Sequence, residues 1–516
     1  MFDLGRVIVG WPRLTVEAAA GSSVTLRYAE QLRADGSLAT DSTRPAATDH
    51  YVTAGSGSET WEPRFSLRRF RFVEVRGLGA RPKQSAISGQ SVRSEMPVTG
   101  SLHTSDEVIN RLFTEILAEQ ERGFISVPSV GGAFGAEPGS LLGAQAFALT
   151  SCLNRDVQRF YRKWQDDIRD AQLASAKYAK AAPSNAPSDG GAAASAGILV
   201  PWAAYRCYAD RAGLDSHITS MGRWLDAIVE KNPDFIWRNG LGDGAGDPLE
   251  SALRTEPALL ASAELSYSAD ALSRMLRIGG QALQAESVRF QELAQASRAA
   301  FNAKFVLPDG KLQSDTQTAY AVAIARGMLE GEAQRRAGQH LVAALERSER
   351  RLTTGVLGTA LLLPALSRVG RDDLAYAVLQ ALAEPNTSVP RGLPRGPLGE
   401  WMYDAIGGIA LDPDAPAGRH VLVRPRPFAK LTDARASFAS LYGLIESHWS
   451  LHEKSFRLEL TIPVGSSATV WMPYPGAVQV TNPGAKNGDA FSVTRRPEGD
   501  IVEVGSGRYE FVVATP

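Results

Sequence analysis

The stretch EPALLASAELSYSADALSRMLRIGGQAL, residues 256–283, decides the fold class. Its apolar residues recur every three or four positions, as at Leu265, Ala269, Leu272 and Leu276, which is the spacing of one helix face. Segments with the same spacing extend from about residue 105 to about residue 415, with short connections between them. They predict about ten to twelve helices. Because no fixed repeat of a few tens of residues is evident, a closed ring of helical hairpins is favoured over a regular solenoid.

The two ends of the chain carry a different pattern. Before about residue 100, segments such as VTLRYAE (24–30) and FRFVEVRG (70–77) combine β-branched and aromatic residues between turn signals. From about residue 418, HVLVRPRP (420–427) and SFRLELTIP (455–463) return to this pattern. The sequence therefore predicts an α-helical toroid between two β-sandwiches, with domains at 1–102, 103–416 and 417–516.

Composition narrows the classes of function. A chain of 516 residues exceeds the size of one hydrophobic core, which indicates about two to four domains. The 55 basic and 56 acidic residues balance, so neither nucleic acid nor an anionic membrane is expected as a partner. The sequence contains no run of about 18 consecutive apolar residues, so no membrane span is expected. The start MFDLGRVIVGWPRL lacks the pattern of a signal peptide, which favours a cytoplasmic location.

Neither a metal nor a cofactor is expected. The two cysteines, Cys152 and Cys207, are too few for a disulfide framework or a zinc cluster, and their apolar helical surroundings predict core thiols. The segment NGLGDGAGDPLES (239–251) does not have the spacing of a calcium loop. The seven histidines form no triad order with cysteine or serine.

Several phrases of the sequence, in order, resemble one family. They include VPWAAYRCYAD (200–210), LTTGVLGTALLLPALSRVG (352–370) and LGEWMYDAIGGIALDPDAP (398–416) within the helical region. The chain resembles the bacterial α-L-rhamnosidases, inverting glycoside hydrolases with a six-hairpin (α/α)6 barrel flanked by β-domains. The resemblance extends essentially from end to end. It implies the fold strongly and the activity less strongly, because fold and site are separable.

The acid-bearing segment of that family is altered in this sequence. Family members usually have F-L-D-V-P-T-D-C-P-Q-R-D-E-R, with a sugar-orienting Asp in D-C-P and the general acid in R-D-E, where this chain has FISVPSVGGAFGAEPG (124–139). By position, Val130 replaces the Asp, and Phe134 begins the stretch in place of R-D-E. Glu137 lies one position past the acid. Where the family has G-W-G-D-A, Ser195 stands at the Asp.

The family's general base is also missing. It belongs to a W-E-R-W segment followed by N-H-Y-A, and LAEPNTSVPRGLPRGPLGEWMYD (382–404) is too short to hold either phrase. The remaining carboxyl candidates are Glu137 as the acid and Asp243 or Asp247 as a replacement base, about 6.5–9.5 Å from the acid if the enzyme inverts. Glu137 can equally cap a helix that starts near Pro138, and Asp243 and Asp247 can form a plain turn with a helix cap.

A second set of candidates contains no carboxylate pair. Tyr205 and Arg206 lie in a retained phrase, and Tyr403 follows the shortened loop. A tyrosine can exchange a proton and an arginine can hold a carboxylate, which is what a lyase acting on a uronate needs. The residues expected to bind substrate are Phe134, Ser195, Trp202, Arg391, Arg395 and Trp401. For Trp401, helix packing is the alternative interpretation.

Three functions remain open on the sequence. The first is a glycosidase of the α-L-rhamnosidase type with an altered catalytic set. The second is a lyase or isomerase in the same barrel, and the third is a non-catalytic binding protein. All three predict a carbohydrate or glycoconjugate as the small-molecule partner, and the oligomeric state is not indicated.

Overall fold

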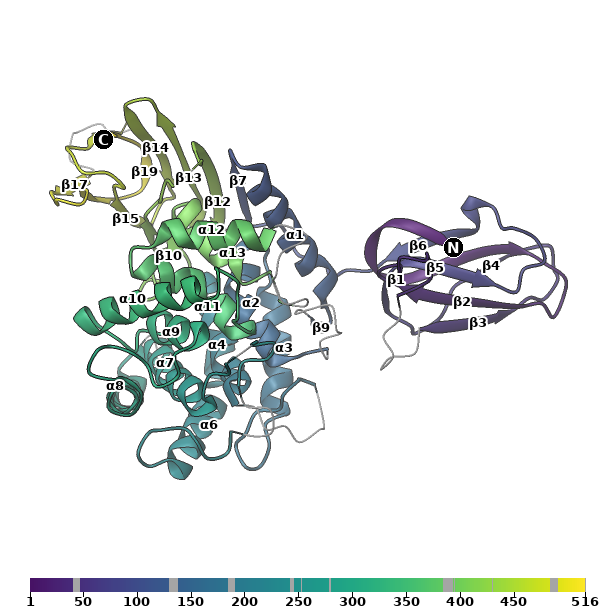
Figure 1. The fold of residues 1–516 in the computed structure, drawn as a ribbon, viewed down its shortest axis with the longest axis horizontal. Coiled ribbons are helices and arrows are strands. Elements are labelled where there is room, and N and C mark those ends of the chain that lie inside the picture. The colour runs from purple at the N-terminus through teal and green to yellow at the C-terminus, as the bar shows by residue number, and fades with distance from the viewer. Residues whose placement is uncertain are drawn as a thin grey trace. The chain divides into compact units, whose positions relative to one another are not determined.

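The chain folds into two compact units, Met1–Glu95 and Met96–Pro516 (Figure 1). The structure, a computed structural model, describes residues 1–39, 47–129, 138–183, 191–241, 246–251, 253–277, 280–383, 393, 395–428, 430–482 and 491–515. No helix in these ranges is both long enough and apolar enough to cross a membrane.

The first unit is a six-stranded antiparallel sheet. Its strands are β1 (Phe2–Glu17), β2 (Ser23–Ala29), β3 (Thr48–Val52), β4 (Ser58–Trp61), β5 (Arg68–Arg76) and β6 (Ile87–Ser91). They follow the order β3-β2-β5-β1-β4, and β6 also pairs with β1. The alternating pattern of β2 buries Val24 and Leu26 completely against Phe70 and Val73 of β5. This unit therefore has a hydrophobic core of its own.

The second unit contains the predicted helices. Those present in the described residues are α1 (Glu107–Gly123), α2 (Leu141–Asn154), α3 (Gln158–Asp170), α4 (Ala196–Tyr208), α5 (Arg211–Asp215), α6 (Ile218–Lys231), α7 (Pro257–Arg277), α8 (Gln284–Phe305), α9 (Gln317–Ala325), α10 (Gly331–Arg347), α11 (Val356–Arg368), α12 (Asp372–Ala383) and α13 (Leu398–Trp401). A π-helical turn, Met402–Ile406, continues α13.

Six of these helices form a closed ring. Going round it, α2 contacts α4, α4 contacts α7, α7 contacts α9, α9 contacts α11, α11 contacts α13, and α13 contacts α2 again. Each is preceded in the chain by an outer helix, namely α1, α3, α6, α8, α10 or α12. The ring helices are buried on nearly all sides, and every residue of α9 is buried. The helical toroid predicted from the sequence is therefore confirmed.

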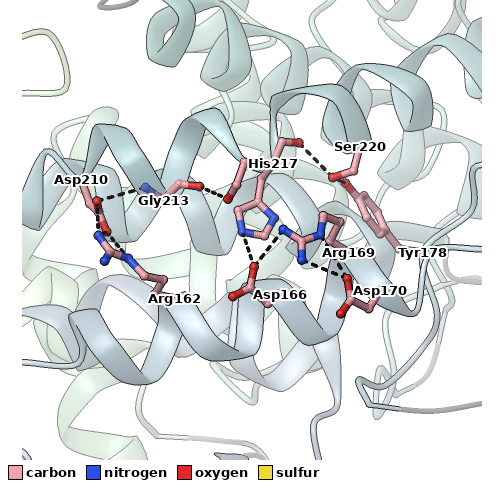
Figure 2. A network of polar contacts seen from close by, with 10 residues as sticks. Arg162, Asp166, Arg169, Asp170, Tyr178, Asp210, Gly213, His217 and Ser220 are labelled. Carbon is pink, nitrogen blue, oxygen red and sulfur yellow. Dashed lines mark hydrogen bonds and ion pairs between the residues drawn. The ribbon is translucent and has the colours of Figure 1, made fainter.

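Outer helices instead bury one stripe and present the other face to solvent. In α3 the buried residues are Tyr161, Trp164, Gln165 and Ile168, at the spacing of one helix face. The polar face of α3 meets the segment from α5 to α6 in a network of charged side chains (Figure 2). There Arg162 pairs with Asp210, and the Nε2 of His217 lies 3.5 Å from Oδ1 of Asp166.

The C-terminal part of this unit is a pair of sheets beside the ring (Figure 1). Its strands are β10 (Ile409–Leu411), β11 (His420–Val423), β12 (Asp433–Ser440), β13 (Gly443–His452), β14 (Ser455–Ile462), β15 (Ser467–Trp471), β16 (Gln479–Thr481), β17 (Phe491–Thr494), β18 (Ile501–Val504) and β19 (Gly507–Ala514). One sheet has the order β10-β11-β15-β18-β17, and the other has the order β16-β19-β14-β13-β12-β7. The predicted fold class, a helical toroid with a β domain on each side in the sequence, is therefore confirmed.

The last strand of the second sheet comes from far away in the sequence. This strand, β7 (Gly100–Thr104), precedes α1 and pairs antiparallel with β12, so that Leu102 lies opposite Ala436. The C-terminal sheet is thus completed by residues that precede the ring. The domain ranges 1–102, 103–416 and 417–516 stay a prediction, with β7 belonging to the C-terminal sheet and the first unit ending at Glu95.

Candidate functional site

The predicted site residues fall into three groups in the structure. Phe134, Glu137, Asp243 and Arg391 lie outside the described residues. In the sequence, the segments that hold them immediately precede the ring helices α2, α7 and α13. The other predicted residues divide between the amino ends and the carboxyl ends of the ring helices. Because α11 has 13 residues, these two ends are about 20 Å apart.

Asp247 lies at the amino end of the ring, buried beside the start of α11. Its Oδ1 accepts a hydrogen bond of 2.7 Å from the backbone N–H of Leu357, and its Oδ2 accepts one of 2.8 Å from the N–H of Gly358. A Cβ on Gly355 would come within 2.4 Å of the Asp247 carboxyl carbon, so a glycine is needed there for this approach. Asp247 therefore caps α11 across a long sequence separation.

The same burial changes the acidity of Asp247. Loss of water raises its pKa to about 7, although the two backbone N–H groups act in the opposite direction. Each carboxylate oxygen has two lone pairs, so a capping Asp247 keeps acceptor capacity for another group. A carboxyl group that is close to half-protonated at neutral pH thus lies at the amino end of the ring.

Glu250 is a second buried acid at this end. Its Oε2 accepts from the backbone N–H of Thr255 at 2.8 Å, and its Oε1 accepts from the Thr255 hydroxyl at 2.6 Å. That hydroxyl also contacts the hydroxyl of Thr316, the N-cap of α9. Glu250 and Asp247 together tie the amino ends of α7, α9 and α11 to the segment 246–255.

Two more of the predicted residues, Ser195 and Arg395, lie at the amino ends of ring helices. Ser195, immediately before α4, is fully buried, and its hydroxyl has no hydrogen-bond partner in the described residues. Arg395, just before α13, forms an ion pair with Glu115 of the outer helix α1. Arg395 is therefore engaged by the outer layer of the toroid.

A cavity of about 610 Å³ lies toward the other end of the ring. Leu153, Arg206, Arg274, Ala325 and Arg368 line it from near the carboxyl ends of α2, α4, α7, α9 and α11. Residues of β10 and β11 line it from the C-terminal sheets. Of the predicted substrate-binding residues, Trp202 and Trp401 contribute to this wall.

Trp401 in this wall is held by packing. Its indole N–H donates a hydrogen bond of 2.8 Å to the hydroxyl of Ser367, and its ring stacks on Phe428 with centroids 5.8 Å apart. Only 2% of its surface is exposed. These contacts favour the packing interpretation of Trp401 that the sequence left open.

The tyrosines and arginine expected for a lyase do not form one cluster. Arg206 lines the cavity with its guanidinium 3.5 Å from Glu400. The hydroxyl of Tyr205 is buried without a hydrogen-bond partner in the described residues, and burial together with Asp414 raises its pKa to about 12. Tyr403 donates to Oδ1 of Asn154 at 3.1 Å, within the core. Three different surroundings therefore hold the three side chains.

The sequence interpretation missed the charged centre of the toroid. Nε of Arg326 donates to Oε1 of Glu264 at 2.7 Å, and the Arg326 guanidinium lies 4.1 Å from the centre of the Tyr267 ring. Gln145 donates to the other oxygen of Glu264 at 3.2 Å. The available signal was the single charge, Glu264, in the otherwise uncharged helical stretch LLASAELSYS (259–268).

No group of three or more His, Cys, Asp or Glu side chains in the described part of the chain could hold a metal ion. Cys152 and Cys207 are both free and buried.

Three family models match the chain, in order. Residues 1–93 match the bacterial α-L-rhamnosidase concanavalin-like domain, residues 97–388 match the bacterial α-L-rhamnosidase six-hairpin glycosidase domain, and residues 408–486 match the bacterial α-L-rhamnosidase C-terminal domain. The second model covers the ring helices from α2 to α11, and α13 lies beyond its end. The resemblance stated from the sequence phrases is therefore confirmed.

Similar proteins agree with these models. An α-L-rhamnosidase of Streptomyces avermitilis is 34% identical over 99% of this chain and 52% of its own length, and one of Formosa agariphila is 27% identical over 99% and 59%. The crystal structure of the Streptomyces avermitilis enzyme complexed with L-rhamnose has a TM-score of 0.85 at 32% identity, covering 99% of this chain and 51% of that one. The native Aspergillus terreus enzyme has a TM-score of 0.83 at 25% identity, over 99% and 61%. The chain thus spans little more than half the length of these relatives.

Proposed function

The chain belongs to the bacterial α-L-rhamnosidase family, and from this membership we propose that it acts on a rhamnoside or a related glycoside with an altered catalytic set. The observation that carries the proposal is the closed ring of six helices, five of which, from α2 to α11, lie within the match to the six-hairpin glycosidase model. A relative of the same fold binds L-rhamnose in its crystal structure, which supports a sugar of this class as the ligand.

Hydrolysis with inversion needs two carboxyl groups with different protonation. One must carry a proton for the leaving oxygen, and the other must be ionised to activate water, at a separation of about 6.5–9.5 Å. We assign the acid to Glu137, the acidic residue beside the family's acid position. Asp243 and Asp247 follow as candidates for the base.

The surroundings of Asp247 support a base that works above neutral pH. A general base must be ionised, and the pKa of Asp247 is raised to about 7 by burial. Its two hydrogen bonds to α11 fix the orientation of the carboxylate, because both oxygens have a backbone donor. The lone pairs that remain would accept the proton of an attacking water.

The lyase alternative receives less support. It needs a base and a cation close to one carbon acid, whereas Tyr205, Arg206 and Tyr403 have separate surroundings. A tyrosine with a pKa raised to about 12 is also a weak source of phenolate near neutral pH. A binding protein without turnover stays the outcome to exclude by experiment.

The test is a product assay on an aryl α-L-rhamnoside, with released L-rhamnose measured by chromatography. We expect turnover far below the usual enzyme range of about 1–10³ s⁻¹, because each vacated catalytic position typically costs about 10²–10⁴-fold. Calorimetric titration with L-rhamnose should detect binding in the same preparation. Formation of an unsaturated uronate from a rhamnosyl-uronate, with L-rhamnose as the eliminated leaving group, would favour the lyase, because hydrolysis releases L-rhamnose together with a saturated uronate. Binding of L-rhamnose without any turnover would favour the binding protein. If the chain neither binds L-rhamnose nor turns over the aryl α-L-rhamnoside, the proposal is contradicted.

A further inference from the structure

The cavity at the carboxyl ends of the ring helices is rich in arginine. Three acidic side chains line it, namely Asp270, Glu400 and Asp404, and so do seven arginines: Arg206, Arg274, Arg298, Arg326, Arg368, Arg424 and Arg426. Helix carboxyl ends carry partial negative charge, which accounts for part of this enrichment. Each of these guanidinium groups is neutralised only if a carboxylate lies close to it.

All but one of these arginines have a carboxylate within 4 Å in the described residues. The pairs are Arg206–Glu400, Arg274–Asp270, Arg274–Asp414, Arg298–Glu330, Arg326–Glu264, Arg424–Asp404 and Arg426–Asp372. Arg368, the last residue of α11, has no such carboxylate in the described ranges. Among these residues, one cation on the wall is therefore left without a direct counterion.

The contacts of Arg368 leave part of its guanidinium available to bind an anion. Its Nη1 donates a hydrogen bond of 3.2 Å to the carbonyl of Ile324 at the end of α9. Burial lowers the pKa of Arg368, Tyr267 opposes this shift, and the nearby cations Arg424 and Arg326 lower the pKa further, with a smaller opposing effect of Glu400. A guanidinium has five N–H donors, and a carbonyl takes up one of them. The other donors can bind an anion, and a planar carboxylate fits their fork.

The wall also contains buried polar atoms without a partner. Oε1 of Gln145, Nε of Arg206 and Nε of Arg298 have no hydrogen bond in the described part of the chain. Only 8% of the surface of Gln145 is exposed, and its side chain lines the cavity. The wall as a whole combines acceptors, such as the side chains of Gln145 and Glu400, with guanidinium donors, which suits a ligand that both donates and accepts hydrogen bonds. Hydroxyl groups do both.

We propose that this cavity binds a small hydroxylated carboxylic acid, such as a sugar acid, with its carboxylate held by Arg368. The hydroxyl groups then meet the polar side chains of Gln145, Arg206 and Arg298 on the wall, and the ring of Tyr267 offers an apolar surface. The cavity volume of about 610 Å³ accommodates a ligand of this size. The cavity reaches Gln145, Leu199 and Ala360 in the first halves of α2, α4 and α11, but Asp247 is not among the residues that line it, so the site goes beyond the proposed glycosidase function.

The test measures binding alone and needs no turnover. Calorimetric titrations of the full chain at constant ionic strength would compare D-glucuronate, D-galacturonate and D-gluconate with neutral D-glucose and with inorganic phosphate. We expect at least one sugar acid to bind with a Kd of about 1 mM or tighter. D-glucose and phosphate should bind at least about tenfold more weakly, because one lacks the carboxylate and the other lacks the hydroxylated body.

Variants then locate the site. Arg368→Gln should weaken sugar-acid binding at least about tenfold, and Arg368→Lys should weaken it less, because the charge stays and the planar fork is lost. The matched control is Arg289→Gln on the outer helix α8. This substitution removes an arginine that is paired with Asp226 and Glu286, and it should leave binding unchanged.

Several results would overturn the proposal. They are the absence of binding by all three acids, equal binding of D-glucose, tighter binding of phosphate, or equal binding by Arg368→Gln and the unchanged chain. If Arg368→Gln does not fold, Arg368→Lys and the comparison of acids with D-glucose on the unchanged chain still decide the matter.

Discussion

Arg326 of the ring donates a hydrogen bond of 2.7 Å to Glu264, a carboxylate with no exposed surface. The two residues are 62 positions apart in the sequence and join the carboxyl end of α9 to the middle of α7. Gln145 of α2 completes the group by donating to the second carboxylate oxygen. The ion pair and the hydrogen bond from Gln145 together therefore link three of the six ring helices.

Removing one partner of this pair should be costly. We expect Glu264→Gln to lower the free energy of unfolding by about 3–5 kcal/mol, because Arg326 would stay buried without its counterion. Denaturation by urea, followed by circular dichroism, measures the change. The exposed Glu332→Gln, which also breaks pairs with arginines, is the control and should leave the transition in place.

A second substitution separates the lost pair from lost packing. The double variant Glu264→Gln with Arg326→Met should regain part of the lost stability, because it removes the unpaired charge. Equal stability of Glu264→Gln and the unchanged chain would show that the pair does not stabilise the ring.

Asp247 gives a pH-dependent prediction for stability. Its pKa is raised from 3.8 to about 7 by burial, so the folded chain holds this proton over a range where the unfolded chain has lost it. Its contribution to stability is present below about pH 4 and decreases as the pH rises to about 7. The stability of the unchanged chain relative to Asp247→Asn should therefore be greater at pH 5 than at pH 8.

Thermal melting of both proteins at the two pH values measures this difference. The buried Glu250→Gln serves as a comparison for the loss of an acid at the same end of the ring, because Glu250 also accepts hydrogen bonds from a residue at the start of a ring helix. A difference between the unchanged chain and Asp247→Asn that is the same at both pH values would contradict a raised pKa.

The ring could be predicted from the sequence because helix periodicity directly records burial. The outer helix α3 has one apolar stripe, and the ring helix α9 is buried along its whole length, as its position between the outer layer and the cavity requires. The strands likewise followed from their alternating residues. That β7 completes the C-terminal sheet could not be predicted, because its partner β12 lies more than 300 residues further along the chain, as in the Ser101–Ser437 contact with a separation of 336.

The site was less predictable from the sequence, because its contacts also join residues that are far apart in the chain. Asp247 was identified as a carboxyl candidate, but its partners on α11 lie 110 and 111 residues away. Nothing in the local sequence indicates which backbone N–H groups a carboxylate will meet. Arg368 follows an apolar segment and has the sequence appearance of an ordinary basic residue in a last helical turn. Its lack of a direct counterion among the described residues is visible only when the ring helices are assembled.

His217 provides a further pH-dependent prediction. Its ring is 3% exposed, and burial lowers its pKa even though Asp166 and Asp170 act in the opposite direction, with Arg169 adding to the decrease (Figure 2). The unfolded chain therefore binds a proton here at a pH where the folded chain does not, and stability is lost as the pH falls through the ordinary value of about 6.5. The melting temperature of His217→Gln should fall less between pH 7.5 and pH 5.5 than that of the unchanged chain. The exposed His50→Gln is the control, and an equal fall in His217→Gln would contradict the prediction.

Glu137 carries the central prediction for the proposed function. An acid that works near neutral pH needs its pKa raised, and the sequence around Glu137 is made of glycine, alanine and proline with no other charge. Glu137→Gln keeps the shape of the side chain and removes its titrating proton. We expect release of L-rhamnose from the best substrate to fall at least about 10²-fold, with binding of L-rhamnose little changed. The matched control is Glu332→Gln on the outer helix α10, which should keep full turnover. If Glu137→Gln also keeps full turnover, Glu137 serves as a helix cap next to Pro138, and the proton donor must be sought among the buried carboxyl groups at the amino end of the ring, beginning with Asp247.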